Sequence, residues 1–157
     1  MKKITALYLL VIAFSIGCNK SSSSSSSSTL ATNSIEFHVD GAKQSYSNAY
    51  ATIGIGSMTG LHLLTVGSND MFPNTIQVKV FDTAAITTKT YLSSSSSDQY
   101  ISTFYGAYQT RQLYPNGYIK ITSITSTNVQ GEFIDSVYKY SDNTWKVVKQ
   151  GKFNVNF

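Results

Sequence analysis

The sequence has little of the chemistry on which catalytic and metal-binding domains rely. It contains one cysteine and two histidines in 157 residues, and charged residues make up only 13%. A lone cysteine can form no disulfide within its own chain, so a hydrophobic core alone must hold the fold together. A zinc site with the usual spacing of Cys and His ligands is also excluded.

Clusters of basic residues and helical apolar stripes are missing as well. The 12 basic residues exceed the 8 acidic ones by only four and are scattered along the chain, which argues against nucleic-acid binding. Beyond the N-terminus, no stretch of about ten residues repeats apolar side chains at 3.6-residue intervals. We therefore expect no long amphipathic helix.

The longest hydrophobic run stands at the N-terminus. Lys2 and Lys3 precede residues 4–16, an almost unbroken apolar run. Its length of about 13 residues fits a signal peptide and falls short of the roughly 20 that span a membrane. We predict that residues 1–17 are a signal peptide that is removed. Its removal leaves ten basic residues against eight acidic ones, so the net charge falls from +4 to +2.

The end of this run, Ser15-Ile16-Gly17-Cys18, resembles a bacterial lipobox, although Ser15 stands where leucine is usual. The resemblance implies that Cys18 receives a diacylglycerol and becomes the mature N-terminus. Two or three acyl chains on one residue hold a protein stably to a bilayer. Asn19 is not the aspartate that retains such proteins at the inner membrane. The resemblance therefore implies the outer membrane, facing either the periplasm or the cell exterior.

A serine-rich segment follows the cysteine. Residues 21–28 are all serine, and mostly polar residues continue to Asn33. Such a composition is typical of a flexible coil, so we predict that residues 18–33 form a tether. Between Cys18 and Ser34 its root-mean-square reach is about 20–24 Å. A neutral low-complexity tract with no selected length is the alternative.

Residues 34–157 suit one domain of about 124 residues. Threonine, serine, valine, isoleucine and tyrosine dominate, and alternation of apolar and polar residues is clearest at residues 76–80. Asp40-Gly41 predicts a hairpin turn, and residues 42–53 are predicted to form one long strand. We expect an all-β fold, an antiparallel β-sandwich of about eight or nine strands, with a β-barrel as the alternative.

Five short pieces of this domain resemble a family of small Bacteroidota lipoproteins of unknown function. The pieces are residues 37–41 (FHVDG), 75–78 (TIQV), 117–122 (GYIKIT), 129–133 (VQGEF) and 151–155 (GKFNV). The resemblance implies a β-sandwich at the outer membrane and no particular chemistry. Asp135 departs from the pattern, because the family continues an apolar face after Phe133.

Three sets of residues are candidates for catalysis or metal binding. Residues 136–139 (SVYK) and 141–143 (SDN) match elements of penicillin-recognising enzymes, but a strand would place the serine and lysine on opposite faces. Glu36, His38 and Asp40 alternate on one strand and could in principle bind a metal, yet residues two apart are about 6.5–7 Å apart. His62 has no evident partner in the sequence. We predict no enzyme, no cofactor and no metal site.

Aromatic residues are the strongest candidates for ligand contact. Tyr105, Tyr108 and Tyr114 lie in one region with Tyr100 and Phe104. Rings on loops can stack on sugars or anchor protein partners. The alternative, which we favour, is cross-strand packing.

The same resemblance suggests a modification. Residues 82–84 (DTA) and 135–137 (DSV) look like the short acceptor pattern for protein O-glycosylation in Bacteroidota, and Thr83 is the better candidate because residues 135–136 are expected in a strand.

Three hypotheses for function follow. The first is a lipid-anchored, non-catalytic module that binds a glycan, a peptide or an envelope protein, and an exposed aromatic patch around Tyr105 and Tyr108 would favour it. The second is a purely structural envelope protein, favoured if those rings are buried. The third is a hydrolase, favoured by two convergent carboxylates or by His38 beside His62.

Overall fold

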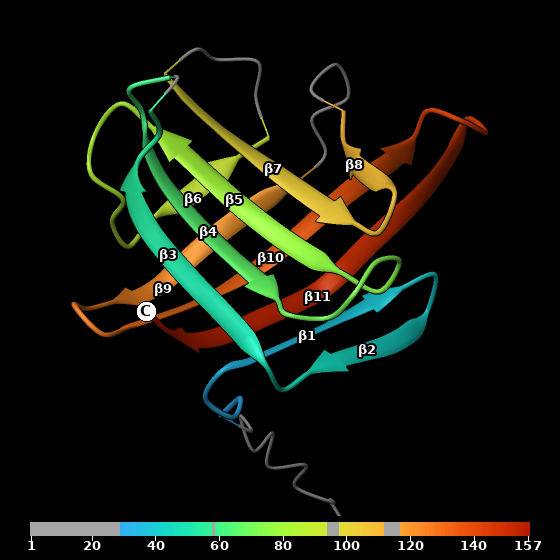
Figure 1. Ribbon diagram of the computed structural model, residues 1–157, viewed down its shortest axis with the longest axis horizontal. Coiled ribbons are helices and arrows are strands. Elements are labelled where there is room, and N and C mark those ends of the chain that lie inside the picture. Colours follow the sequence, from blue (N-terminus) through green and yellow to red (C-terminus); the bar gives the residue numbers. More distant parts are fainter. Residues whose placement is uncertain (1–28, 58, 94–97, 112–116) are drawn as a thin grey trace, which may run out of the picture.

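The computed structural model describes residues 29–57, 59–93, 98–111 and 117–157. Within these ranges the chain forms antiparallel strands and no helix, and a single sheet of eleven strands curls into a nearly closed barrel (Figure 1). The all-β prediction is confirmed, in its barrel rather than its sandwich form. The strands are β1 (Ser34–Val39), β2 (Ala42–Tyr46), β3 (Ala49–Ile55), β4 (His62–Ser68), β5 (Ile76–Asp82), β6 (Thr90–Leu92), β7 (Gln99–Tyr105), β8 (Tyr108–Thr110), β9 (Tyr118–Ile124), β10 (Asn128–Lys139) and β11 (Thr144–Asn156).

The main path through the sheet is β2-β1-β11-β10-β8-β7-β5-β4-β3, and β9 and β6 branch from it at β10. The first part of β10 pairs with β9, whereas Val137 and Tyr138 pair with β8. The edge strands β2 and β3 have no ladder between them, and β3 approaches β11 across the gap. Where the sheet meets itself, Ala49 N donates a hydrogen bond to Asn33 O at 2.9 Å.

One predicted strand is two strands in the structure. Residues 42–53 were expected to continue without a break, but the chain turns at Ser47 and Asn48. β2 pairs with β1, while β3 pairs with β4 on the other edge of the sheet. Ser and Asn are turn-forming residues, but a single such pair inside an alternating run is a weak signal. This split and the three-residue strands β6 and β8 raise the strand count above the prediction.

The barrel bends at one bulge in β11. Gln150 has a φ of 52°, a left-handed conformation, and the register of β11 shifts at this level against both β1 and β10. An extra residue on one strand increases the local twist and bends the strand. The bulge therefore lets the long strands β10 and β11 wrap around the core.

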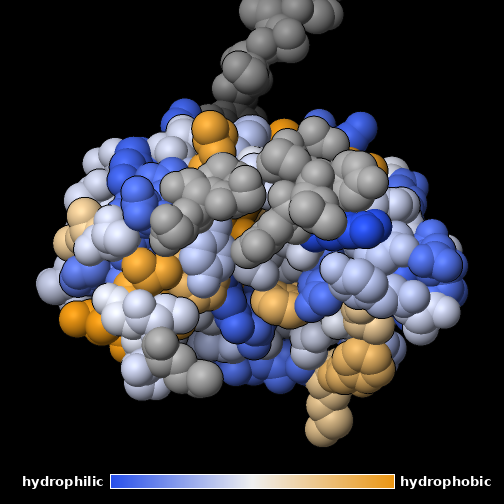
Figure 2. Space-filling model, turned by 90° about the horizontal axis from the view of Figure 1, so that it is seen from above, coloured by the Kyte–Doolittle hydropathy of each residue, from blue (hydrophilic) through white to orange (hydrophobic). Residues whose placement is uncertain are grey.

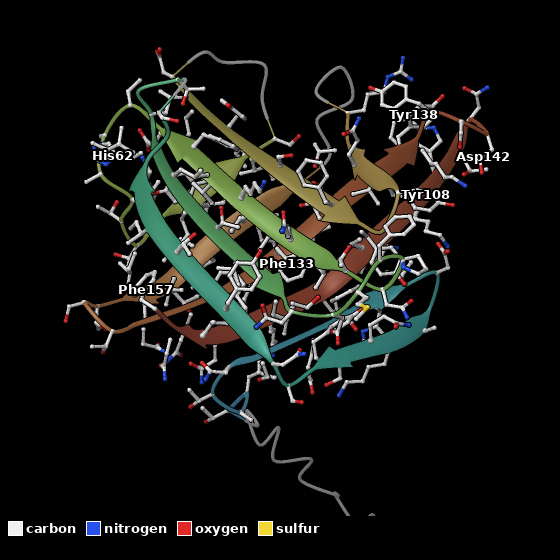
Figure 3. The ribbon with its side chains drawn as sticks, viewed as in Figure 1. His62, Tyr108, Phe133, Tyr138, Asp142 and Phe157 are labelled. Atoms are coloured by element: carbon white, nitrogen blue, oxygen red, sulfur yellow. The ribbon has the colours of Figure 1, made fainter. Side chains whose placement is uncertain are left out.

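A repeated Gln-Gly-x-Phe motif occupies the centre of the core. It occurs as residues 130–133 in β10 and 150–153 in β11, and the two copies pair so that each glycine faces the other copy's phenylalanine. A Cβ on Gly151 would lie 2.6 Å from the ring of Phe133, and a Cβ on Gly131 would lie 2.5 Å from Lys120 O and collide with Phe153. Both rings fill the space that the glycines leave, and Phe133 lies in the middle of the barrel (Figure 3).

Asp135 lies where β10 changes partner, and it is 1% exposed. The Thr110 hydroxyl accepts a hydrogen bond from Thr103 N at 2.6 Å and donates one to Asp135 Oδ2. Ser136 N donates to Asp135 Oδ1 at 2.8 Å. Gly117, at the start of β9, closes over the carboxylate, because a Cβ there would lie 2.5 Å from Oδ1. The side chains of Asp135 and Thr110 thus supply hydrogen bonds at the point where the ladder is interrupted.

Candidate functional site

The aromatic cluster predicted from the sequence is divided between the two faces of the sheet. Neighbouring residues of a strand point to opposite faces. Tyr105 therefore packs against the core, with its ring 5.7 Å from Phe37, while Phe104 points outward. Tyr108 also packs against the core.

Tyr108 is half-buried at the end of the barrel near the β10–β11 hairpin (Figure 3). Its hydroxyl lies 3.1 Å from Thr144 Oγ1, and Lys146 Nζ lies 5.3 Å from its ring centroid. Tyr105 and Tyr108 therefore form no contiguous exposed patch, and they are not completely buried either. Their contacts are mainly with the fold.

The outward rings of β5 and β7 line a groove. Phe81 and Tyr100 are paired across these strands, with their ring centroids 4.2 Å apart and their planes at 14°. Phe104 follows on β7, and Lys79 Nζ lies 5.1 Å from the centroid of its ring. The groove has a volume of about 460 Å³. It is lined by Lys79, Phe81, Tyr100, Ile101, Ser102, Phe104, Gln109, Thr110, Arg111 and Tyr140.

The groove exists because β8 is short. β8 pairs with β7 only at residues 104–105 and with β10 only at residues 137–138, so no described strand bridges the two longer strands beyond it. Arg111 and Tyr140 line this space from the β8 and β10 side.

An aromatic cluster supports that side of the groove. Tyr138 contacts Tyr140 edge-to-face at 4.9 Å and Trp145 at 4.7 Å. The guanidinium of Arg111 lies 4.9 Å from the Tyr138 ring centroid, and Tyr138 donates a hydrogen bond to Asn143 Oδ1. These contacts hold Arg111 against two rings, so its charged group is presented in a defined place.

The groove is positively charged. Lys79 and Arg111 line it, and none of its lining residues is a carboxylate. Asp135 is bonded to Thr110, one of the lining residues, but its carboxylate is itself buried. Burial raises the pKa of Asp135 above its usual value, although the hydrogen bond from Thr110 opposes the shift. The described rim of the groove therefore favours an uncharged or anionic ligand.

Glu36 and Asp40, the carboxylates considered as metal ligands, form ion pairs with lysines. Glu36 forms an ion pair with Lys43 at 3.0 Å, and Asp40 with Lys146 at 2.7 Å. His38, which lies between them in the sequence, has a buried Nδ1 without a hydrogen-bond partner among the described residues. No group of three possible metal ligands occurs in the described ranges.

The hydrolase hypothesis requires two convergent carboxylates or neighbouring histidines. The described lining of the groove contains no carboxylate. Three other hollows in the surface, beside Tyr46, His38 and Val147, are each lined by a single carboxylate. His38 pairs with β2 and β11, whereas His62 pairs with β3 and β5, so the two histidines lie on different parts of the sheet.

The penicillin-type motif lies in a strand, as predicted. Residues 136–139 belong to β10, and Lys139 is bound by Asp142 at 2.7 Å, in the hairpin that follows.

The two candidate O-glycosylation patterns differ in their exposure. Thr83 is exposed in the loop after β5, where its N–H donates to Asp98 O at 2.9 Å, while Asp135 of the second pattern is buried. Cys18 and Tyr114 lie outside the described residues.

Comparisons with protein-family models, with curated proteins and with solved structures found no match. The described ranges contain no helix long and apolar enough to cross a membrane.

The sequence directed attention to the region that contains the groove, but it put forward Tyr105 and Tyr108, which pack against the core. Tyr100 and Phe104 were in the predicted cluster, and they line the groove. Phe81, Arg111 and Tyr140 were not predicted as site residues. The signal available was the two-residue period, which places residues 79, 81, 100, 102 and 104 on one face once β5 and β7 are paired.

Proposed function

We propose that the chain is a lipid-anchored outer-membrane protein whose β-domain binds a glycan in the groove between β7 and β10, without a catalytic step. The observation that carries the proposal is the groove itself. Its volume falls within the range of about 300–1,000 Å³ that is typical of small-ligand sites.

The lining suits a sugar ring in two respects. A sugar ring has C–H groups on its faces and hydroxyl groups around its edge. The outward rings of Phe81, Tyr100 and Phe104 offer an apolar surface for the face. The side chains of Gln109 and Arg111 offer hydrogen-bonding groups for the edge.

The charges of the residues that line the groove favour one class of glycan. Two cations and no carboxylate line the groove, so a glycan that carries carboxylate or sulfate groups gains attraction that a neutral one does not. An acidic glycan is therefore the favoured ligand class.

A glycan array tests the proposal. The chain from residue 18 onward, with Cys18→Ser, is screened, and the affinity for an oligosaccharide that binds is then measured for Phe104→Ala. Removal of one stacking ring should weaken binding about tenfold or more. Tyr50→Ala is the matched control, because Tyr50 is an aromatic residue of β3 outside the groove, bonded to Gln77. Equal losses in both variants, or binding to no glycan, would contradict the proposal and favour a structural role.

The lipid anchor is tested separately in cells. Cys18→Ala should move the protein from the membrane to the soluble fraction, because the acyl chains are lost. A variant that stays in the membrane fraction would contradict anchoring at Cys18. Protease added to intact cells then distinguishes the two orientations, since only a surface-exposed domain is cut.

A further inference from the structure

The loop between β4 and β5, residues 69–75, exposes two adjacent hydrophobic side chains. Met71 is 88% exposed and Phe72 is 67% exposed, the two highest values among the large hydrophobic residues given for the described ranges. Single exposed apolar residues are common on protein surfaces, but two neighbours at a loop tip are not explained by the fold. Figure 2 shows a hydrophobic group that stands clear of the molecular outline.

The loop is held in place by its own hydrogen bonds. Asn74 N donates to Met71 O at 3.0 Å, which closes a turn around Phe72. At its end, Gly106 N in the β7–β8 turn donates to Thr75 O at 2.9 Å. The two side chains are therefore presented by a fixed turn, which lowers the entropy that is lost when they bind.

The loop lies at the end of the barrel where the tether enters. Ala49 N bonds to Asn33 O, and the preceding residue, Asn48, bonds to the loop through Asn69 and Asp70, at 2.8 and 3.4 Å. Residues 29–33 lie beside the β2–β3 turn at the lower end of Figure 1. Leu30 O also accepts a hydrogen bond from Asn154 at 2.8 Å, so the end of the tether is fixed on the domain.

The tether keeps this end near the bilayer. The reach predicted for the segment from Cys18 is comparable to the radius of a domain of this size. A contact made by a tethered domain is intramolecular, so even a weak apolar contact is occupied. Asp70 is the only charged residue of the loop, and its partner Asn48 is neutral, so burial of the two apolar side chains has to outweigh the repulsion between one carboxylate and anionic lipid.

We propose that this loop is a second membrane contact, in which Met71 and Phe72 enter the interfacial layer of the bilayer that holds the acyl chains of Cys18. The proposal rests on the lipid anchor proposed above and is independent of the glycan groove. A contact at the tether and another at the loop would fix the orientation of the domain on the membrane, and with it the direction of the groove.

A fluorescent probe tests whether the loop meets lipid. The chain lipidated at Cys18 is reconstituted into vesicles of phosphatidylethanolamine and phosphatidylglycerol, with an environment-sensitive fluorophore on Phe72→Cys. The emission should shift to the blue and be quenched by nitroxide-labelled lipids. Ile55→Cys is the matched control, because Ile55 is 66% exposed and lies at the other end of β3 from Ala49. Its probe should remain in water.

The probe experiment has four outcomes that support or overturn the membrane contact. A blue shift at residue 72 alone supports the proposal. A probe that stays in water at residue 72, on a chain that remains anchored, overturns it and leaves the anchor intact. A shift that appears only when envelope proteins are added assigns the loop to a protein partner and also overturns it. Failure of Cys18 to be lipidated removes both the anchor and this proposal.

A flotation assay gives an independent measurement. With Cys18→Ser, the chain has no acyl chains, so any weak partitioning onto the same vesicles at high lipid concentration reports the loop alone, although it is too weak to retain the protein in a cell membrane fraction. Met71→Ser with Phe72→Ser should lower the partition coefficient about a hundredfold, since each of the two side chains contributes about a factor of ten when it leaves water. Ile53→Ser with Ile55→Ser removes two exposed hydrophobic residues elsewhere and should leave it unchanged. Equal effects of the two double variants would overturn the proposal.

Discussion

The inner and outer faces of the sheet use aromatic rings in different ways. Inside the barrel, Phe37, Phe133 and Phe153 contact one another at centroid distances of 5.9 and 6.3 Å and are almost completely buried. Outside, Phe81 and Tyr100 are closer to each other, at 4.2 Å, but retain part of their surface for a ligand. The same residue types thus stabilise the fold on one face and form the candidate site on the other.

The comparison indicates that the role of a ring depends on the face of the sheet from which it projects. Inside the barrel, Phe133 and Phe153 are matched to glycines, which leave room for them on the neighbouring strand. On the outer face, Lys79 lies over Phe104 and Arg111 lies over Tyr138. Packing complementarity is expected to control stability, and the ring–cation surface is expected to control binding.

The largest expected effect is the loss of an inner ring. Phe133→Ala should lower the free energy of unfolding by about 3–5 kcal/mol, because it leaves a cavity at the centre of the core. Tyr140→Ala, on the exposed outer face, should change it by no more than about 0.5 kcal/mol. Urea denaturation measures both, and similar losses would contradict the assignment of the two faces.

Overpacking at a glycine should have the next largest effect. Gly131→Ala should destabilise the fold by about 1–3 kcal/mol, because the new Cβ meets the backbone at Lys120 O, 2.5 Å away, as well as a ring. Gly54→Ala is the control, since a Cβ at Gly54 meets nothing within 4 Å. If thermal denaturation places the two variants at the same midpoint, the close packing of the paired motifs is not required.

On the outer face, a change of charge should separate two classes of ligand. Lys79→Gln should weaken binding of an acidic glycan several-fold, because one attraction of about 1 kcal/mol or less is lost at this partly exposed site. Binding of a neutral glycan should be unchanged. Calorimetric titration at two salt concentrations measures this, and an equal loss for both glycans would show that the charge of Lys79 has no part in selection.

A smaller effect is expected at Asp135. Its pKa is raised in the folded state, so the folded protein takes up a proton at a higher pH than the unfolded chain does. This residue therefore adds stability as the pH falls from above its folded pKa towards its unfolded value. Asp135→Asn should lack that gain. Its unfolding free energy, relative to that of the unsubstituted protein, should therefore be greatest at neutral pH.

The measurement is the difference in unfolding free energy between Asp135→Asn and the unsubstituted protein from neutral to acidic pH. The difference should shrink as the pH falls. Asp135→Ala is the control, because it leaves Thr110 Oγ1 and Ser136 N without their acceptor and should be less stable at every pH. A difference that is constant with pH would contradict a raised pKa.

The sequence predicted the strands where alternation is strict and the turn where residue type requires it. Residues 76–80 and the Asp40-Gly41 turn are examples, since Asp40 and Gly41 both have positive φ. It could not predict that one edge of β10 is shared between β8 and β9, because pairing of distant strands depends on contacts that no local pattern records. For the same reason Tyr140 could not be placed beside Tyr100, with which it shares the groove.

The adjacent residues Phe104 and Tyr105 test the account most directly, because their rings lie on opposite faces of one strand. Melting temperature and glycan affinity are measured for Phe104→Ala and for Tyr105→Ala, the affinity well below each melting temperature. The account predicts that Phe104→Ala loses affinity with little change in melting temperature, and that Tyr105→Ala lowers the melting temperature with its affinity retained. Loss of affinity in Tyr105→Ala alone would place the site on the inner side and contradict the account.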